Sequence, residues 1–288
     1  MKDYVIFTDS GCDIAPELLK EWNVELIELL FRREGSVMEM RPSSMPVKDF
    51  YDRMRAGDVF RTAAANENTL RQAFVPKLRA GLDILYVCFS SGLSGTFGTA
   101  ELAAEELMKE YPERRVAVVD TLCASAGQGL LLWYAAKAAN AGASMDDVLK
   151  ELLDKRPHLA HWFTVDDLVY LKRGGRVGSV AAFFGGVLNI KPVLHVDDEG
   201  HLIPMQKVRG RINAIKAIVK KYRETALDPE HGEYFISHGD CIDDAKRLER
   251  MLRDEFGQNA ALITDIGPVI GAHSGPGTLA LFYLSRER

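Results

Sequence analysis

Residues 84–96 read ILYVCFSSGLSGT, an apolar run that passes directly into serine, glycine and threonine. A short apolar run bounded by turn-forming residues is typical of a buried strand, and residues 100–109 that follow have a helix-like composition. The sequence therefore predicts a strand, a tight loop and the start of a helix in direct succession. Such a corner can bind an anion, because the first N–H groups of a helix are unpaired and its dipole puts positive charge there.

Hydroxyl groups in this loop add to its capacity to bind an anion. Ser90, Ser91, Ser94 and Thr96 supply hydrogen-bond donors, so a carboxylate or a phosphate could be held without a lysine or an arginine. No lysine follows Gly95, which excludes a Walker loop, and Thr96 stands where a nucleophile elbow centred on Ser94 needs glycine. One alternative stays open, in which the hydroxyls only cap the helix.

Strand-like and helix-like segments alternate through the first half of the chain. The expected strands are residues 4–8, 24–30, 84–89 and 116–119, and the expected helices are residues 16–22, 46–56, 68–79, 126–142 and 145–155. Apolar strands separated by helices favour a parallel sheet, which binds ligands at the carboxyl ends of its strands. Asp9-Ser10 and Asp120-Thr121 follow two of these strands, so we expect them beside residues 90–96. Residues 31–45 are expected to form a small insertion.

The second half changes character after Arg156-Pro157, where we place a domain boundary between residues 1–157 and 158–288. Residues 191–206 read as a hairpin around a turn at 197–200, which indicates antiparallel structure. The other expected strands are residues 159–164, 234–237, 261–264 and 279–284. The expected helices are residues 166–171, 177–188, 209–223 and 243–256. Residues 172–176 are expected to form a glycine-rich basic turn. His273 stands among the glycines and prolines of residues 267–277, which predicts a constrained loop and a candidate site residue.

Composition limits the class of protein. The net charge of −5 disfavours a general nucleic-acid-binding protein, because phosphate backbones are bound by clustered positive charge. No apolar stretch reaches the roughly 20 residues that cross a bilayer, so we expect no stable membrane insertion. The four dispersed cysteines form no Cys-x-x-Cys pair, which fits the cytoplasm. His158 and His161 lack a third ligand at supporting spacing, so neither a metal nor a cofactor is expected.

Several motifs occur in an order that is specific when they are taken together. They are Thr8-Asp9-Ser10, Thr62, residues 90–96, Asp120-Thr121, residues 171–176 and residues 267–277. With them the chain resembles the DegV family of bacterial fatty-acid-binding proteins over essentially its full length. The resemblance implies an amino-terminal α/β domain and a carboxyl-terminal α+β domain, with a long-chain fatty acid held between and beneath them.

The resemblance also implies a function. Members of the family similar to this chain deliver the bound acid to a separate fatty acid kinase subunit. That subunit phosphorylates the carboxylate to an acyl phosphate, which is used in phospholipid synthesis. The chain itself is then expected to be a lipid-binding subunit without catalytic activity.

Residue roles follow from the same resemblance. Thr62 and Ser94 match the hydroxyls that hold the carboxylate, and His273 is expected close to it. The supporting loop residues are Ser91, Gly92, Gly95 and Thr96. Arg173 and Arg209 fall where the family has basic residues implicated in kinase docking. The chain departs from the family at residues 63–65, where three alanines replace a second hydroxyl and a proline.

A second hypothesis makes the protein an enzyme. Ser94 as nucleophile and His273 as base would give a serine-dependent esterase or acyltransferase. That chemistry needs a contact between serine and histidine and a carboxylate that orients the histidine, and the elbow pattern is missing. The carrier is the preferred interpretation.

Overall fold

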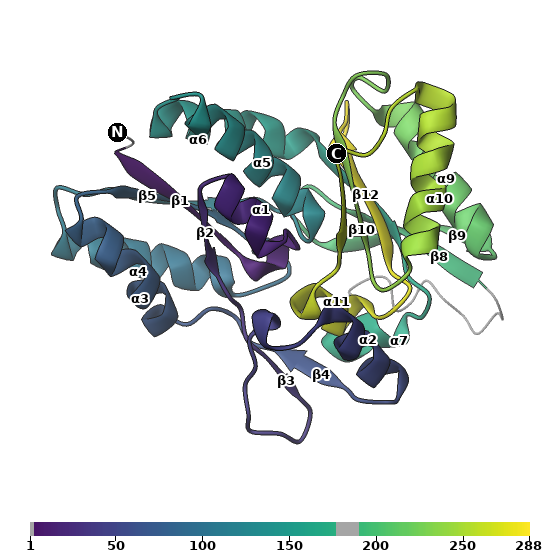
Figure 1. The fold of residues 1–288 in the computed structure, drawn as a ribbon, viewed down its shortest axis with the longest axis horizontal. Coiled ribbons are helices and arrows are strands. Elements are labelled where there is room, and N and C mark those ends of the chain that lie inside the picture. Colours follow the sequence, from purple (N-terminus) through teal and green to yellow (C-terminus); the bar gives the residue numbers. More distant parts are fainter. Residues whose placement is uncertain (1–2, 177–189) are drawn as a thin grey trace.

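A parallel sheet forms the base of the first half of the chain (Figure 1). The computed structural model describes residues 3–176 and 190–288. Four strands pair in the order β2-β1-β5-β6, namely β1 (Tyr4–Asp9), β2 (Val24–Ile27), β5 (Asp83–Cys88) and β6 (Val116–Asp120). All three pairings are parallel, so the carboxyl ends of these strands lie at one edge of the sheet.

Helices cover both faces of this sheet, because successive side chains of each strand point to opposite faces. Tyr86 packs in a core with α3 and α4, whereas Val87 packs in the core of the opposite face with α5 and α6. The helices beside this sheet are α1 (Pro16–Glu21), α3 (Glu67–Arg79), α4 (Thr96–Glu110), α5 (Ala126–Asn140) and α6 (Met145–Lys155).

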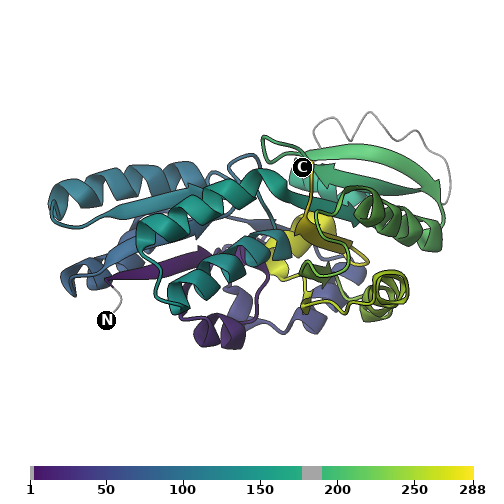
Figure 2. The same cartoon turned by 90° about the horizontal axis from the view of Figure 1, so that it is seen from above.

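The second half contains a six-stranded mixed sheet beside the first one (Figures 1 and 2). In the order β11-β10-β12-β7-β8-β9, its strands are β11 (Leu262–Asp265), β10 (Tyr234–His238), β12 (Leu279–Leu284), β7 (Leu159–Thr164), β8 (Ile190–Val196) and β9 (Leu202–Arg209). The pairing of β10 with β11 is parallel, and the other four pairings are antiparallel. The predicted fold class is confirmed.

Helix α5 joins the cores of the two halves. One face of the mixed sheet is covered by α9 (Arg211–Thr225) and α10 (Ile242–Phe256), and the other face packs against α5. The apolar side chains of α5 therefore contact strands of both sheets, which explains why this helix is apolar almost all round. Since one core spans both sheets, the division at residue 157 stays a prediction.

The insertion is larger than the expected residues 31–45. Strand β3 (Phe31–Arg33) pairs with β4 (Phe60–Thr62), and η2 (Pro42–Ser44) and α2 (Val47–Arg55) lie between them. Phe31, Phe50 and Phe60 pack against Ala272 of the short helix α11 (Pro268–Ser274), which belongs to the second half. This packing places the end of β4 beside α11.

Three local predictions are wrong. Residues 267–277 are not all loop, because Pro268 begins α11 and Gly275, at φ 81°, ends it. The short helix expected at 166–171 is α7 (Val169–Gly174), which takes up part of the expected basic turn. Arg209 ends strand β9 and does not begin a helix. The helix expected at 177–188 lies outside the described residues. No helix in the described ranges is long and apolar enough to cross a membrane.

Candidate functional site

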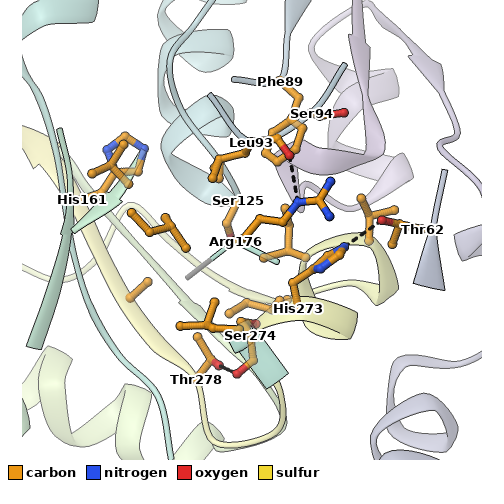
Figure 3. A pocket seen from close by; sticks show the side chains of 18 of the residues that line it. Thr62, Phe89, Leu93, Ser94, Ser125, His161, Arg176, His273, Ser274 and Thr278 are labelled. Atoms are coloured by element: carbon orange, nitrogen blue, oxygen red, sulfur yellow. Dashed lines mark hydrogen bonds between the residues drawn. The ribbon is translucent and has the colours of Figure 1, made fainter. Parts of the chain in front are cut away.

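A cavity of about 910 Å³, part of it open to solvent, lies where the two halves meet (Figure 3). The apolar part of its wall comes from both halves and includes Leu29, Phe89, Leu93, Phe163, Leu171, Val196, Leu202, Ile266, Val269, Ile270, Ala280 and Phe282. The polar side chains of the wall are Thr62, Ser94, Ser125, His161, Arg176, His273, Ser274 and Thr278. The cavity therefore suits a ligand that is largely apolar and has a polar group.

The first polar contact in this cavity joins the two halves. The hydroxyl oxygen of Thr62, at the end of β4, lies 2.7 Å from Nε2 of His273 in α11. A neutral imidazole carries one N–H, and with that hydrogen on Nε2 the hydroxyl of Thr62 accepts it. The O–H of Thr62 can then donate to a third group, such as a ligand oxygen.

His273 is held in its neutral form by its surroundings. Its Nδ1 is buried and has no hydrogen-bond partner among the described residues. Burial, together with the nearby positive charges of Arg176 and Arg61, lowers the pKa of His273 to about 4. The ring fits beside α7 because Gly174 has no side chain, since a Cβ there would lie 2.2 Å from Nδ1. The imidazole is therefore neutral and closely packed at neutral pH.

Ser94 supplies a second hydroxyl from the loop between β5 and α4. Its oxygen lies 2.9 Å from the hydroxyl oxygen of Thr96 and accepts a hydrogen bond from the N–H of Thr96 at 3.2 Å. The hydroxyl oxygen of Thr96 in turn accepts from the N–H of Ala65 at 3.2 Å. Thr96 thereby ties the segment after β4 to the start of α4, and this tie helps place Thr62 and Ser94 in the wall of one cavity.

Arg176 was not predicted as a site residue. Its side chain lines the cavity, with Nε donating to the carbonyl oxygen of Leu93 at 3.1 Å and Nη1 donating to that of Gly174 at 2.6 Å. Burial lowers the pKa of this guanidinium, which still remains charged. The side chain therefore puts a positive charge beside Ser94 and His273. In the sequence it stands in a basic glycine-rich segment, where nothing distinguishes it from exposed neighbours such as Arg173.

The other two polar corners of the parallel sheet serve the fold and do not line the cavity. Asp9 is fully buried, and its carboxylate accepts hydrogen bonds from the N–H groups of Gly11 and Phe89 and from the hydroxyl of Tyr86, each at 2.9 Å. Asp120 accepts from backbone N–H groups at 3.0 and 3.1 Å. Both corners lie beside residues 90–96 as expected, since Asp9 accepts from the N–H of Phe89 and Asp120 from that of Ser91, but neither aspartate lines the cavity.

The predicted supporting loop is used in different ways. Gly95 lines the cavity, whereas Ser91 is exposed. Gly92 packs against the turn between β8 and β9, where a Cβ would lie 2.7 Å from the carbonyl oxygen of Glu199. Ser90 strengthens that contact by donating to the carbonyl oxygen of Gly200 at 3.0 Å. Part of this loop thus binds the second half of the chain.

Two further sets of predicted residues lie at the surface. Arg173 and Arg209 are exposed, and their backbone carbonyl oxygens accept hydrogen bonds from Arg61 and Asn213. Ala63 and Ala64, at the place where the chain departs from the family, are exposed and line the cavity. The missing hydroxyl therefore affects the cavity wall directly.

The geometry does not favour an esterase. In a catalytic triad the histidine is oriented by a carboxylate, but Nδ1 of His273 has no such partner in the described part of the chain. Its Nε2 is bonded to Thr62, and the Ser94 oxygen is bonded to Thr96. Residues 3–176 and 190–288 also hold no group of three histidine, cysteine or acidic side chains arranged for a metal ion.

Comparison with known proteins places the chain in a family. Residues 3–286 match the family model described as "Uncharacterised protein, DegV family". The chain belongs to the DegV family. A DegV domain-containing protein of Clostridium perfringens is 38% identical over 285 residues, which cover 99% of this chain and 98% of that protein.

Solved DegV structures have the same fold. A DegV lipid-binding protein from Thermotoga maritima is 30% identical, covers 100% of both chains and superposes with a TM-score of 0.86. A structure that describes fatty acid binding of a DegV family protein from Thermus thermophilus is 30% identical, covers 99% of this chain and 100% of that one, and has a TM-score of 0.89. DegV relatives of this chain thus bind fatty acids.

Proposed function

We propose that this protein binds a long-chain fatty acid and presents its carboxylate to a separate kinase subunit for conversion to an acyl phosphate. The observation that carries the first part is the cavity itself, with apolar walls from both halves and with Thr62, Ser94, His273 and Arg176 among its polar groups. Fatty acid binding by DegV relatives supports the same assignment.

The apolar wall accounts for the affinity of a long acyl chain. Burying a methylene group contributes about 0.8 kcal/mol, so a chain of about fifteen carbons contributes at most about 12 kcal/mol before entropy is lost. A buried carboxylate would cancel much of this gain unless donors reach it. Hydroxyl donors from Thr62 and Ser94, together with the charge of Arg176, meet that requirement.

Transfer of a phosphoryl group requires that the carboxylate stays within reach of a second protein. The cavity is partly open to solvent. The exposed Arg173 belongs to α7, and Leu171 of the same helix lines the cavity. We assign Arg173 and Arg209 to docking of the kinase subunit, because exposed charges mainly guide association with a partner. The product, an acyl phosphate, is a substrate for phospholipid synthesis.

The test is mass spectrometry of an organic extract of the purified protein, combined with binding of a fluorescent fatty acid to the delipidated protein. We expect one long-chain fatty acid for each chain and no hydrolysis of acyl esters. The absence of any fatty acid in the extract together with no binding to the delipidated protein would refute the proposal. Hydrolysis that is lost in Ser94→Ala would favour the esterase instead.

A further inference from the structure

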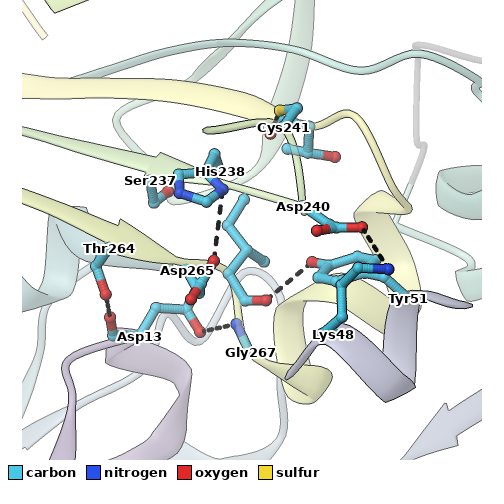
Figure 4. Close-up of polar contacts among 12 residues, drawn as sticks. Asp13, Lys48, Tyr51, Ser237, His238, Asp240, Cys241, Thr264, Asp265 and Gly267 are labelled. Atoms are coloured by element: carbon cyan, nitrogen blue, oxygen red, sulfur yellow. Dashed lines mark hydrogen bonds and ion pairs between the residues drawn. The ribbon is translucent and has the colours of Figure 1, made fainter. Parts of the chain in front are cut away.

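A polar cluster around Asp13 links the two halves of the chain at the start of α11 (Figure 4). Asp13 follows the short helix η1 (Ser10–Cys12) and is 8% exposed. Its Oδ1 accepts a hydrogen bond from the N–H of Gly267 at 2.9 Å, and its carbonyl oxygen accepts from the hydroxyl of Thr264 at 2.8 Å. One residue of the first half therefore holds the segment that leads into α11 at two points.

The same carboxyl group also holds the cavity wall. Its Oδ2 accepts a hydrogen bond from the hydroxyl of Ser125 at 2.5 Å, and Ser125 lines the cavity at the start of α5. The oxygen of Ser125 lies 2.9 Å from the hydroxyl oxygen of Ser237 in β10. The two oxygens of Asp13 are thus bonded to two different elements that line the site.

Helix α11 carries this constraint to His273. Gly267 is the residue that precedes the helix, and His273 lies in its last turn. A helix of seven residues is only about 10 Å long, so a shift at one end moves the other end. The first half holds both ends, since Asp13 binds Gly267 and Thr62 binds His273.

A buried carboxyl group at this place is costly, which argues for a role that a smaller residue would not fill. Burial raises the pKa of Asp13 to about 8, although the hydrogen bonds from Ser125 and Gly267 act in the opposite direction. In the neutral acid Oδ1 still accepts from Gly267, so the contact with α11 does not depend on the charge.

We propose that Asp13 is a positioning residue for the carboxylate site: its carboxyl group holds Gly267 and so sets where α11 places His273 against Thr62. The inference rests on the proposed function, in which His273 and Thr62 lie beside the bound carboxylate. Asp13 is then expected to affect how tightly the carboxylate end of the ligand is bound and not how tightly its hydrocarbon chain is bound.

The experiment compares two ligands of equal length, palmitate and hexadecanol, in the full-length protein. Asp13→Gly removes the carboxyl group without backbone strain, because Asp13 has a left-handed φ of 52°. We expect Asp13→Gly to lower palmitate affinity about tenfold and to leave hexadecanol affinity within about twofold of wild type. Asp13→Asn keeps the acceptor for Gly267 and is expected to bind both ligands within about threefold of wild type.

Asp240 provides a matched control. It is also an aspartate with φ 52°, and it also links the halves, through an ion pair with Arg55 of α2. It makes no hydrogen bond to α11 among the described contacts, so Asp240→Gly is expected to leave both affinities within about twofold of wild type. A general weakening of the contact between the halves would affect Asp13→Gly and Asp240→Gly alike.

Three results would overturn the inference while wild type binds palmitate. They are an unchanged palmitate affinity in Asp13→Gly, equal losses for palmitate and hexadecanol, and a loss in Asp13→Asn as large as that in Asp13→Gly. If Asp13→Gly does not fold, Gly267→Ala is the alternative test. Its Cβ would lie 3.2 Å from Oδ1 of Asp13 and would disturb the hydrogen bond between Gly267 and Asp13. It is expected to lower only palmitate affinity, and wild-type affinity would refute the inference. Failure of wild type to bind palmitate would refute the proposed function itself.

Discussion

Replacing Thr62 by valine tests the carboxylate site most directly, because valine keeps the shape of the side chain and removes only the hydroxyl. Thr62 is bonded to Nε2 of His273 and lines the cavity. A hydrogen bond to a charged group contributes about 1.5–3 kcal/mol, which corresponds to a loss of about tenfold to a hundredfold in affinity. The change also leaves both ring nitrogens of His273 without a partner among the described residues, which should lower the free energy of unfolding by about 1 kcal/mol.

The assay is competition of palmitate and of hexadecanol against a fluorescent fatty acid, with urea unfolding of each variant. We expect palmitate affinity to fall by the stated factor and hexadecanol affinity to change little, because an alcohol carries no charge for the hydroxyl to stabilise. Thr164→Val is the control, since Thr164 is fully buried in β7 and its hydroxyl has no partner in the described structure. A palmitate affinity within about twofold of wild type in Thr62→Val would show that the carboxylate is held elsewhere.

Three further predictions concern other parts of the site. Gly174→Ala should lower palmitate affinity by about tenfold, because its Cβ would lie 2.2 Å from Nδ1 of His273, and competition binding measures the loss. His273 has a folded-state pKa of about 4, below its ordinary value of 6.5, so the unfolded chain takes up this proton at a higher pH and the folded state loses stability as pH falls from 6.5 to 4. NMR titration of the imidazole in delipidated protein should give a midpoint near 4, and a midpoint near 6.5 would contradict the burial argument. Charge reversal at Arg173 and Arg209 together should weaken acyl phosphate formation with the kinase, more at low salt, and leave bound fatty acid unchanged; normal product formation would remove the docking assignment.

Sequence patterns predicted the elements whose signals lie next to one another in the chain. Residues 84–96 form strand β5, a loop and the start of α4 as expected, because the apolar run and the glycines lie next to each other in the chain. The seven residues of α11 were missed, since a helix that short has too few turns to show an apolar period. Its Pro268 and Gly275 were visible in the sequence as a start and a stop signal, and read together they would have indicated it.

Tertiary contacts decide the rest of the site, and the sequence does not contain them in readable form. Asp9 ends β1 and Ser94 lies in the loop after β5, so both stand at the carboxyl edge of the parallel sheet. Asp9, however, accepts hydrogen bonds from Phe89 and Tyr86, whereas Ser94 lines the cavity. Arg176 is a site residue only because α7 packs beside the loop that contains Leu93. Whether a polar side chain can bind a ligand therefore depends on whether neighbouring groups already form its hydrogen bonds.

The cavity wall and the core that joins the two halves share side chains. Phe163, Val196 and Phe282 of the mixed sheet pack in the core that contains α5, and they also line the cavity. An acyl chain against these residues would bury more apolar surface in the same contact that holds the two sheets together. A ligand that binds only the folded state adds about 2.7 kcal/mol of stability at a concentration of 100 Kd. Ligand binding and the packing of the two halves are therefore expected to be coupled through these three side chains. In the proposed function, Thr62, Ser94 and His273 instead select the end group that the ligand carries.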